Sequence, residues 1–339
     1  PARPVGAALG LGLVALAAVA GAVAPRGSTT GTLRVAAVQG GGARGFRAVD
    51  VDPQVVFDAH VAASAGIRPP VDVVLWPEDV VDVDGPLAGS PEEGTLAGLA
   101  RALGTTLVAG VVEDTEPGRF RNAALAWGPD GVVVARYDKV HRVPFGEYVP
   151  GRAFIRHLAD LSAVPRDAIA GRGPGLLPTA AGRLGVLVSY EVFFTDRARA
   201  AVGAGADLLL VPTNASSFST SQVPGQELAA ARLRAVETGR TVVQAAPTGY
   251  TAVVDAGGRV RARSALGGPE VLTRTVERRQ GRTLAARAGE LPLVVLSGGV
   301  LLLMRGKLSA AFATSLTRRS KRGYSYGQEH TNVAGGAPW

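Results

Sequence analysis

The chain of 339 residues is long enough for one large domain or two ordinary ones, and its aromatic content of 5% implies an aliphatic core. It has no cysteine, which excludes disulfides, thiolate metal sites and thiol catalysis in this sequence, and its histidines lack the spacing of a metal site (His60, His141, His157 and His330). The net charge of +8 suggests an acidic partner, and its placement favours anionic lipid over nucleic acid, for which no binding motif is present.

The first element is an uncharged run from Val5 to Ala24, flanked by Arg3 and Arg26. About 20 residues at about 1.5 Å per residue cover the roughly 30 Å of a bilayer core. The run therefore predicts a transmembrane helix in residues 1–26. The alternative, a secretory signal peptide, usually has a shorter apolar run. Because the chain begins at Pro1, we expect it to be a piece of a longer protein.

A second apolar run, LPLVVLSGGVLLLM, extends from Leu291 to Met304. The run is short for a membrane span, but the charged side chains that flank it could extend to the membrane surface and the residues that follow could lengthen it. We therefore expect a second transmembrane helix at residues 291–310. The basic cluster from Arg318 to Arg322 predicts a disordered cytoplasmic tail at residues 311–339, and the positive-inside rule places residues 27–290 outside the cytoplasm.

Between these runs, strand and helix patterns alternate, which indicates a layered α/β domain. We expect strands at residues 33–39, 71–76, 106–113, 121–127, 132–137, 184–188, 206–212, 241–246, 250–255 and 272–277. We expect helices at residues 53–64, 91–103, 153–161, 195–203 and 225–239. The segment from Pro144 to Pro178 is punctuated by Pro and Gly, and together with Asn214 to Val223 it is predicted to form a lid.

Three of the expected strands end at residues with reactive side chains. Glu78 follows Trp76 and Pro77, where a partly apolar pocket would raise its pKa into the range of a general base. Lys139 is the only lysine outside the C-terminal basic region, and its ammonium would stabilise an oxyanion. Ser189 occupies the position expected for a nucleophile. The alternatives are a surface Glu, a solvated Lys and a structural Ser.

The segments WPE, YDKVHRVPFGEYVP, LGVLVSYEVFF, PTNASSF and AAARLRAVETGR together resemble the nitrilase (carbon–nitrogen hydrolase) superfamily, over about residues 33–292. The resemblance is greatest to its membrane branch, the apolipoprotein N-acyltransferases. It implies a four-layer αββα sandwich flanked by two transmembrane helices. It also implies a catalytic Glu78, Lys139 and nucleophile position 189, supported by Glu147, Tyr190 and Glu191, with no metal and no cofactor.

The sequence departs from that family at two places. Ser189 stands where the family has Cys, and a Ser would form an ordinary ester, which is a worse acyl donor than a thioester. The substitution is either engineered or natural. The second departure is Ala215-Ser216-Ser217, where relatives often carry bulkier or acidic residues, and this puts substrate contacts there in question.

The resemblance implies a multi-pass enzyme of the bacterial plasma membrane with an extracytoplasmic catalytic domain. It would transfer a fatty acyl chain from a phospholipid to the N-terminal amine of a diacylglyceryl-cysteine lipoprotein, through an acyl-enzyme on residue 189. One alternative is a non-catalytic membrane scaffold that keeps the fold. Another is a hydrolase of small amides, which the two predicted spans disfavour.

Overall fold

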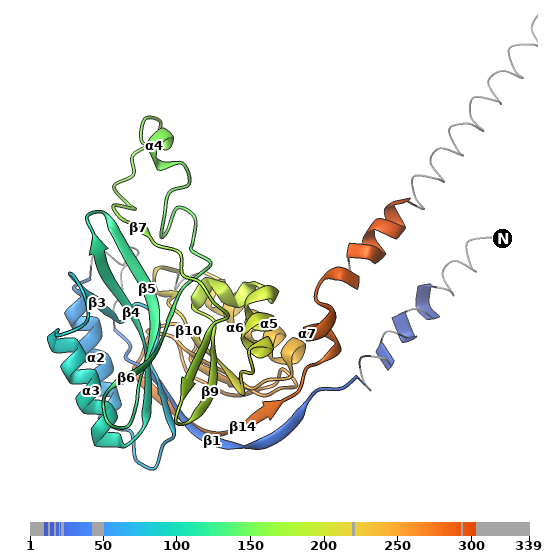
Figure 1. Ribbon diagram of the computed structural model, residues 1–339, viewed down its shortest axis with the longest axis horizontal. Coiled ribbons are helices and arrows are strands. Elements are labelled where there is room, and N and C mark those ends of the chain that lie inside the picture. Colours follow the sequence, from blue (N-terminus) through green and yellow to red (C-terminus); the bar gives the residue numbers. More distant parts are fainter. Residues whose placement is uncertain are drawn as a thin grey trace, which may run out of the picture. The chain divides into compact units, whose positions relative to one another are not determined.

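The computed structural model describes residues 10–12, 14–16, 18–19, 21, 24–42, 51–218, 221–292 and 294–302. The chain divides into two units, residues 1–287 and residues 288–339, and each is described by itself. The first unit contains two sheets with helices (Figure 1), so the predicted α/β class is confirmed.

The first sheet mixes parallel and antiparallel strands. Its order is β14 (Glu270–Gln280), β1 (Ser28–Gln39), β2 (Val73–Leu75), β4 (Thr106–Glu116), β5 (Arg119–Trp127) and β6 (Val133–Asp138), with β3 (Val81–Val83) beside β4 and β7 (Asp167–Ala168) beside β5. The second sheet is built around three parallel strands. Its order is β13 (Val260–Arg263), β12 (Ala252–Val254), β11 (Val242–Ala245), β10 (Leu208–Pro212), β9 (Gly182–Val186) and β8 (Leu176–Thr179).

Alternate residues of one strand pack into different hydrophobic layers, because successive side chains of a strand point to opposite faces. On β2, Val73 and Leu75 join the core between the two sheets, whereas Val74 packs with Leu96 of helix α3 (Pro91–Leu103). The second sheet does the same: Leu208 and Leu210 of β10 face the inter-sheet core, whereas Leu209 and Val211 face α5 (Thr195–Gly203) and α6 (Val223–Thr238). With α2 (Pro53–Ser64) beside α3, the layers are helix, sheet, sheet and helix.

Local signals fix the ends of the predicted helices. Ser90 accepts a hydrogen bond from the backbone N–H of Glu93 at 3.1 Å, as the Ser-Pro-Glu-Glu sequence predicts for a helix start. Gly104 ends the helix in the left-handed conformation, with φ of 60°. The helix expected at 153–161 is wrong in length, since α4 covers only Arg152–Ile155. None of the α4 side chains is buried, so no packing stabilises a longer helix there. Helical propensity alone rarely stabilises a short helix in water.

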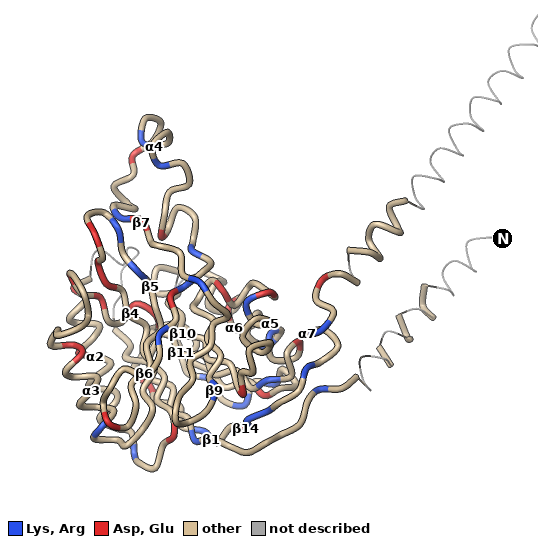
Figure 2. The backbone as a smooth tube through the Cα atoms, in the orientation of Figure 1, with Lys and Arg blue, Asp and Glu red and all other residues tan. Residues whose placement is uncertain are grey.

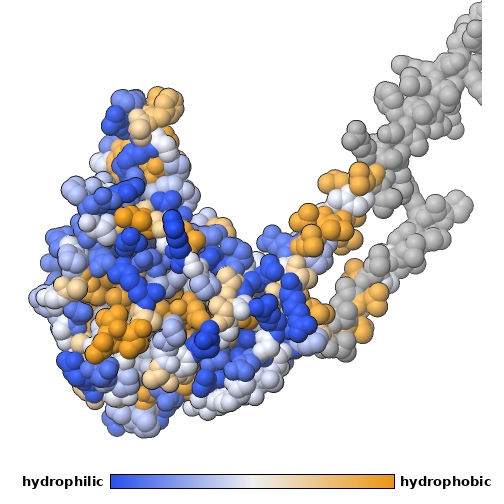
Figure 3. Space-filling model, in the orientation of Figure 1, coloured by the Kyte–Doolittle hydropathy of each residue, from blue (hydrophilic) through white to orange (hydrophobic). Residues whose placement is uncertain are grey.

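The long segment after Lys139 stands off from the two sheets around α4 (Figure 1). Phe154 and Leu158 there are about 70% exposed, and Figure 3 shows apolar surface at the tip beside hydrophilic surface. Elsewhere Lys and Arg are interspersed with Asp and Glu over the first unit (Figure 2).

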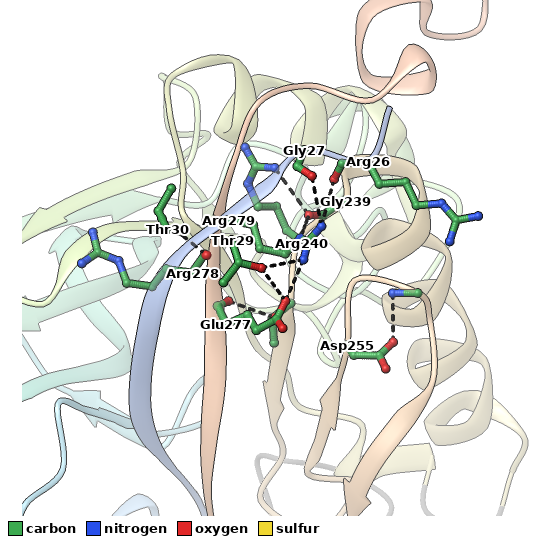
Figure 4. Close-up of polar contacts among 12 residues, drawn as sticks. Arg26, Gly27, Thr29, Thr30, Gly239, Arg240, Asp255, Glu277, Arg278 and Arg279 are labelled. Atoms are coloured by element: carbon green, nitrogen blue, oxygen red, sulfur yellow. Dashed lines mark hydrogen bonds and ion pairs between the residues drawn. The ribbon is translucent and has the colours of Figure 1, made fainter. Parts of the chain in front are cut away.

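The start of β1 and the end of β14 are held together by arginines (Figure 4). Arg279 donates to the carbonyl oxygens of Gly239, Arg26 and Gly27. Arg240 is buried and donates to the carbonyls of Ala206 and Gly281, both at 2.8 Å. Helix α7 (Leu284–Ala288) follows directly. These contacts fix the two points at which the chain enters and leaves the sandwich.

The two predicted membrane spans are not confirmed. In the part of the chain that the structure describes, no helix combines the length and the apolar character that crossing a bilayer requires. Described residues between 10 and 21 and between 291 and 302 are helical and expose apolar side chains (Leu11, Val14, Leu16, Val19, Leu291, Val294, Val295, Leu296, Val300, Leu301 and Leu302). Residues 1–9, 13, 17, 20, 22–23, 293 and 303–310 of the predicted spans, and the predicted tail at 311–339, lie outside the described residues.

Candidate active site

Three of the predicted site residues form one buried cluster. Strands β2, β4 and β6 run in the same direction, so the loops after β2 and β6 emerge at one edge of the first sheet. Lys139, which follows β6, is 2% exposed and donates to Glu78 Oε1 at 2.8 Å and to Glu147 Oε1 at 2.9 Å. An ammonium has three N–H groups, and among the described residues its third has no partner.

Asn122 is a fourth member of this cluster, and sequence reasoning missed it. Its Nδ2 lies 2.9 Å from Glu78 Oε1 and 2.8 Å from Glu147 Oε1, so it bridges the same two carboxyl oxygens as Lys139. Its position on β5 is set by the backbone, because the Lys139 N–H donates to the Asn122 carbonyl at 2.8 Å. An Asn in an apolar strand is a visible signal, but only the strand pairing shows that it faces this site.

The two carboxyls of the cluster have different surroundings, which move their pKa values apart. Burial raises the pKa of Glu78; the charge of Lys139 opposes this and that of Glu147 adds to it. Burial acts in the same sense on Glu147, but Lys139, the backbone N–H of Val143 and Asn122 outweigh it and lower its pKa. Burial would lower the pKa of Lys139, yet its two carboxylates raise it. Glu78 is therefore suited to exchange a proton while Glu147 holds Lys139 charged and in place.

Glu191 joins this cluster to the turn that carries Ser189. The side chain is fully buried in η2 (Ser189–Phe193). Its Oε2 accepts the backbone N–H of Val188 at 2.9 Å, just before Ser189. Its Oε1 accepts the N–H groups of Val140 and His141, just after Lys139, at 2.8 and 3.1 Å. One carboxylate thus ties the backbone just before Ser189 to the backbone just after Lys139.

The same Glu191 oxygen is supported from behind. Tyr137 donates its hydroxyl to Oε1 at 2.8 Å and accepts a hydrogen bond from Arg197 at 2.9 Å. Burial, followed by the charge of Glu191, raises the pKa of Tyr137, which therefore stays a donor. Glu191 is therefore held by Tyr137 and, through it, by Arg197. Tyr137 begins the YDKVHRVPFGEYVP segment, but neither Tyr137 nor Arg197 was predicted to be a site residue.

Backbone strain is concentrated at this site. Among the described residues, the only non-glycine residues with positive φ are Asp79 at 57°, Phe145 at 60° and Ser189 at 49°. Asp79 is next to Glu78, and Phe145 is two residues before Glu147. Ser189 is the predicted nucleophile position. Such conformations each cost of order 1–3 kcal/mol and persist where the surroundings enforce them, which is common at functional sites. Ser189 is 8% exposed, and its hydroxyl makes no hydrogen bond to a residue that the structure describes.

One glycine is required for the position of Glu78. Gly110 on β4 donates its N–H to the Pro77 carbonyl at 3.0 Å. A Cβ at this position would collide with the Pro77 carbonyl and the Glu78 Cα. The absence of a side chain therefore lets the loop after β2 lie directly on β4.

The other predicted positions are more peripheral. Tyr190 packs its ring edge-on against Phe194 at 4.9 Å, outside the hydrogen-bonded cluster. Asp79, next to Glu78, is half-buried, has a positive φ, and accepts a hydrogen bond from Asn214 at 3.3 Å. In the Ala215-Ser216-Ser217 segment, Ser216 is buried and accepts the Thr248 hydroxyl at 3.0 Å. In the described part of the chain no three His, Asp or Glu side chains are grouped to hold a metal ion.

Residues 34–286 match the family model described as carbon–nitrogen hydrolase. The apolipoprotein N-acyltransferase of Geobacter metallireducens is 36% identical over 235 residues, covering 68% of this chain and 44% of that protein. The apolipoprotein N-acyltransferase of Mycolicibacterium smegmatis is 31% identical over 300 residues, covering 84% and 50%. The chain thus spans about half the length of the curated relatives it matches.

The solved structure of Saccharomyces cerevisiae Nit3, a member of branch 10 of the nitrilase superfamily, superimposes with a TM-score of 0.57. It is 21% identical and covers 75% of this chain and 92% of Nit3. At that identity the likeness concerns the fold, and it agrees with the observed two-sheet sandwich, which is nitrilase-like as predicted.

Proposed function

Because the chain belongs to the carbon–nitrogen hydrolase family, we propose that it is an acyltransferase of lipoprotein maturation. It would take a fatty acyl chain from a phospholipid and pass it to the N-terminal amine of a diacylglyceryl-cysteine lipoprotein. The observation that carries the proposal is the buried Glu78–Lys139–Glu147 cluster, fastened by Glu191 to the strained turn at Ser189. The names of the relatives support the substrate class.

In the first half-reaction, Glu78 takes the proton of the Ser189 hydroxyl as the oxygen attacks the ester carbonyl of the phospholipid. The Oγ–C bond forms, and the oxyanion is held by the free N–H of Lys139 and by a backbone N–H after Ser189. The ester C–O bond then breaks, and Glu78 returns the proton to the leaving glycerol oxygen. An acyl ester on Ser189 and a lysophospholipid result.

In the second half-reaction, the neutral amine of the lipoprotein attacks the acyl ester. Glu78 takes a proton from the nitrogen as the N–C bond forms, and gives it to Oγ as the Oγ–C bond breaks. Glu147 has no proton to exchange in this scheme; it keeps Lys139 charged and in position. Tyr190, which follows the nucleophile, is assigned a supporting role beside the acyl chain.

The membrane context belongs to the proposal as well. The apolar segments at 5–24 and 291–310 are proposed to anchor the domain at the bacterial plasma membrane, with residues 27–290 outside the cytoplasm. The segment around α4 and the loop containing Phe218 would cover the entering lipid, since Phe145, Phe154 and Phe218 are all more than half exposed. Protease added to intact spheroplasts should cut residues 27–290; cutting of the tail alone would contradict this orientation.

The function is tested at residue 189. We expect Ser189→Cys to create or greatly raise the formation of an acyl adduct from phospholipid, measured by intact mass, because a thiol is the better nucleophile and its thioester the better acyl donor. In that background Glu78→Ala should abolish the adduct. Ser28→Cys, at an exposed position at the start of β1, is the matched control and should form none. If the Ser189→Cys variant folds and binds lipid but forms no adduct, the scaffold alternative replaces the enzyme.

A further inference from the structure

Glu227 is a buried carboxyl near the start of α6 that the mechanism above does not use. It is 3% exposed and forms no ion pair among the described residues. Its Oε1 accepts the hydroxyl of Thr213 at 2.7 Å, and its Oε2 has no hydrogen-bond partner there. A buried acid without a cation is destabilising compared with an apolar or amide side chain, so such a residue beside a reactive site points to a function.

The partner of Glu227 follows the strand next to the one that leads to Ser189. Strands β9 and β10 are parallel, with Leu210 opposite Val186. The segments that follow them, which carry Ser189 and Thr213, therefore leave the second sheet at the same edge. In addition, α6 packs against the η2 turn, so the helix that carries Glu227 also supports the turn that carries Ser189.

The next residue connects this strand end to the other sheet. Asn214 donates its Nδ2 to Asp79 Oδ2 at 3.3 Å, and its Oδ1 accepts the backbone N–H of Ser216 at 3.2 Å, which fixes the orientation of the amide. Asp79 adjoins Glu78 and has a strained backbone. A continuous path of contacts therefore runs from α6 through the end of β10 to the loop that carries Glu78.

Glu227 also lies within the electrostatic field of the cluster. Burial raises its pKa to about 7; the hydrogen bond from Thr213 lowers it, the charge of Glu78 raises it and the charge of Lys139 lowers it. The elements packed on α6 are η2, α5, β11 and β12, and the last two contain no titratable side chain. The others contain Tyr190, Glu191, Asp196, Arg197 and Arg199. Of these, Glu191 and Arg197 lie 3.8 Å apart and offset one another.

We propose that Glu227 is a positioning residue of this site, which fixes the Glu78 loop through Thr213, Asn214 and Asp79 and whose proton sets the charge experienced by Glu78 and Lys139. This inference rests on the roles proposed for Glu78 and Lys139. It adds a third carboxyl to the site, behind the nucleophile rather than in contact with substrate. Removing it should therefore change the reactivity of residue 189 in a pH-dependent way, which loss of a purely structural contact would not do.

The test uses the absence of cysteine from the chain. The Ser189→Cys variant then has a single thiol, and its alkylation by iodoacetamide, followed by intact mass from pH 5 to 9, requires neither phospholipid nor lipoprotein. In this background we expect the rate profile to show an inflection near neutral pH. Glu227→Gln should remove that inflection and shift the remaining titration of the thiol to lower pH, because no negative charge develops beside it.

A second variant separates the charge from the contact. Thr213→Val keeps the Glu227 carboxyl but removes its hydrogen bond, so the inflection should persist and move to higher pH, because that bond lowers the pKa of Glu227. Both variants should reduce acyl-adduct formation from phospholipid vesicles by roughly tenfold to a hundredfold, the loss expected when a catalytic group is misplaced by about 1 Å. Glu116→Gln, an exposed carboxyl on β4, is the control and should change neither measurement.

The alkylation profiles and the acyl-adduct measurement test different proposals. If no variant forms an acyl adduct, the proposed acyl transfer is wrong, but the alkylation profiles still decide the role of Glu227. If folded Glu227→Gln and Thr213→Val proteins alkylate with the same pH profile as their Ser189→Cys parent, Glu227 does not act on the site and the inference is overturned.

Discussion

Glu191 lies in the turn that carries Ser189, and Glu227 lies in the helix packed against that turn; both are buried carboxyls, yet their surroundings are opposite. Glu191 accepts hydrogen bonds from three backbone N–H groups and from Tyr137, whereas Glu227 accepts one, from Thr213. A carboxylate with many donors holds the chain in one geometry. A carboxyl with few donors takes up a proton easily because nothing compensates its burial. The difference suggests that one group fastens the site and the other tunes its charge.

Glu78 lies between these two extremes. It has a cation and an amide donor, but no backbone donor and a second carboxylate close by. Three substitutions test this comparison. They remove the cation of Lys139, the carboxyl of Glu227 with few donors and the carboxyl of Glu191 with many donors.

The largest effect is expected for Lys139→Met. The change leaves Glu78 and Glu147 buried without their shared cation, and breaking a buried ion pair from one side costs about 3–5 kcal/mol of unfolding free energy. Urea denaturation measures it at neutral pH. Arg119→Met is the matched control, because its pair with Glu116 is more than half exposed and contributes little. A loss below about 1 kcal/mol would show that the cluster does not depend on Lys139.

The next effect concerns Glu227 and pH. Its folded pKa of about 7 is above the ordinary value of 4.5, so the folded state binds the proton more tightly. The resulting stabilisation is fully present below pH 4.5 and is lost as pH rises through 7. Relative to Glu227→Gln, the wild-type protein should lose roughly 3 kcal/mol of unfolding free energy across that window. Thermal or urea denaturation at a series of pH values measures it. Parallel stability curves for the two proteins would contradict this assignment.

A smaller but definite effect is expected for Glu191→Gln. The amide keeps the shape but turns one acceptor into a donor that faces backbone N–H groups, which costs about 1–3 kcal/mol. Acyl-adduct formation in the Ser189→Cys background should fall as well, because Ser189 and Lys139 are no longer fastened together. Glu116→Gln makes the same chemical change on the surface and should stay within about 0.5 kcal/mol of wild type. If Glu191→Gln and Glu116→Gln changed the unfolding free energy and adduct formation equally, Glu191 would not hold the Ser189 turn to the segment after Lys139.

Much of the sandwich was predictable because its strands are strongly patterned. Val73–Leu75 and Leu208–Pro212 are apolar on both faces, which is typical of strands covered by helices on one side and a second sheet on the other. The Ser90 cap and Gly104 stop were equally clear. The strands that were missed have two to four residues, or contain a proline such as Pro178 in β8, and their pairing is decided by distant partners.

The sequence predicted only those site residues that lie at the ends of strands or match a family motif. Glu78 and Lys139 meet because the strands before them end at one edge of the first sheet, whereas Glu147 was assigned to the site only through the family resemblance. Asn122 and Tyr137 lie inside strands whose register alone turns them toward the site. Glu227 sits in a helix that looks ordinary in sequence. The contact of Asp79 with Asn214 could not be predicted either, because it joins loops that follow strands of different sheets.

The comparison between satisfied and unsatisfied carboxyls is tested most directly by infrared spectroscopy of the wild-type chain at pH 6, where a protonated buried carboxyl absorbs apart from carboxylates. We predict such a band in the wild type and in Glu116→Gln, and its loss in Glu227→Gln. The band should fade in the wild type as pH rises through about 7. A wild-type spectrum without the band, or a band unchanged in Glu227→Gln, would contradict the account.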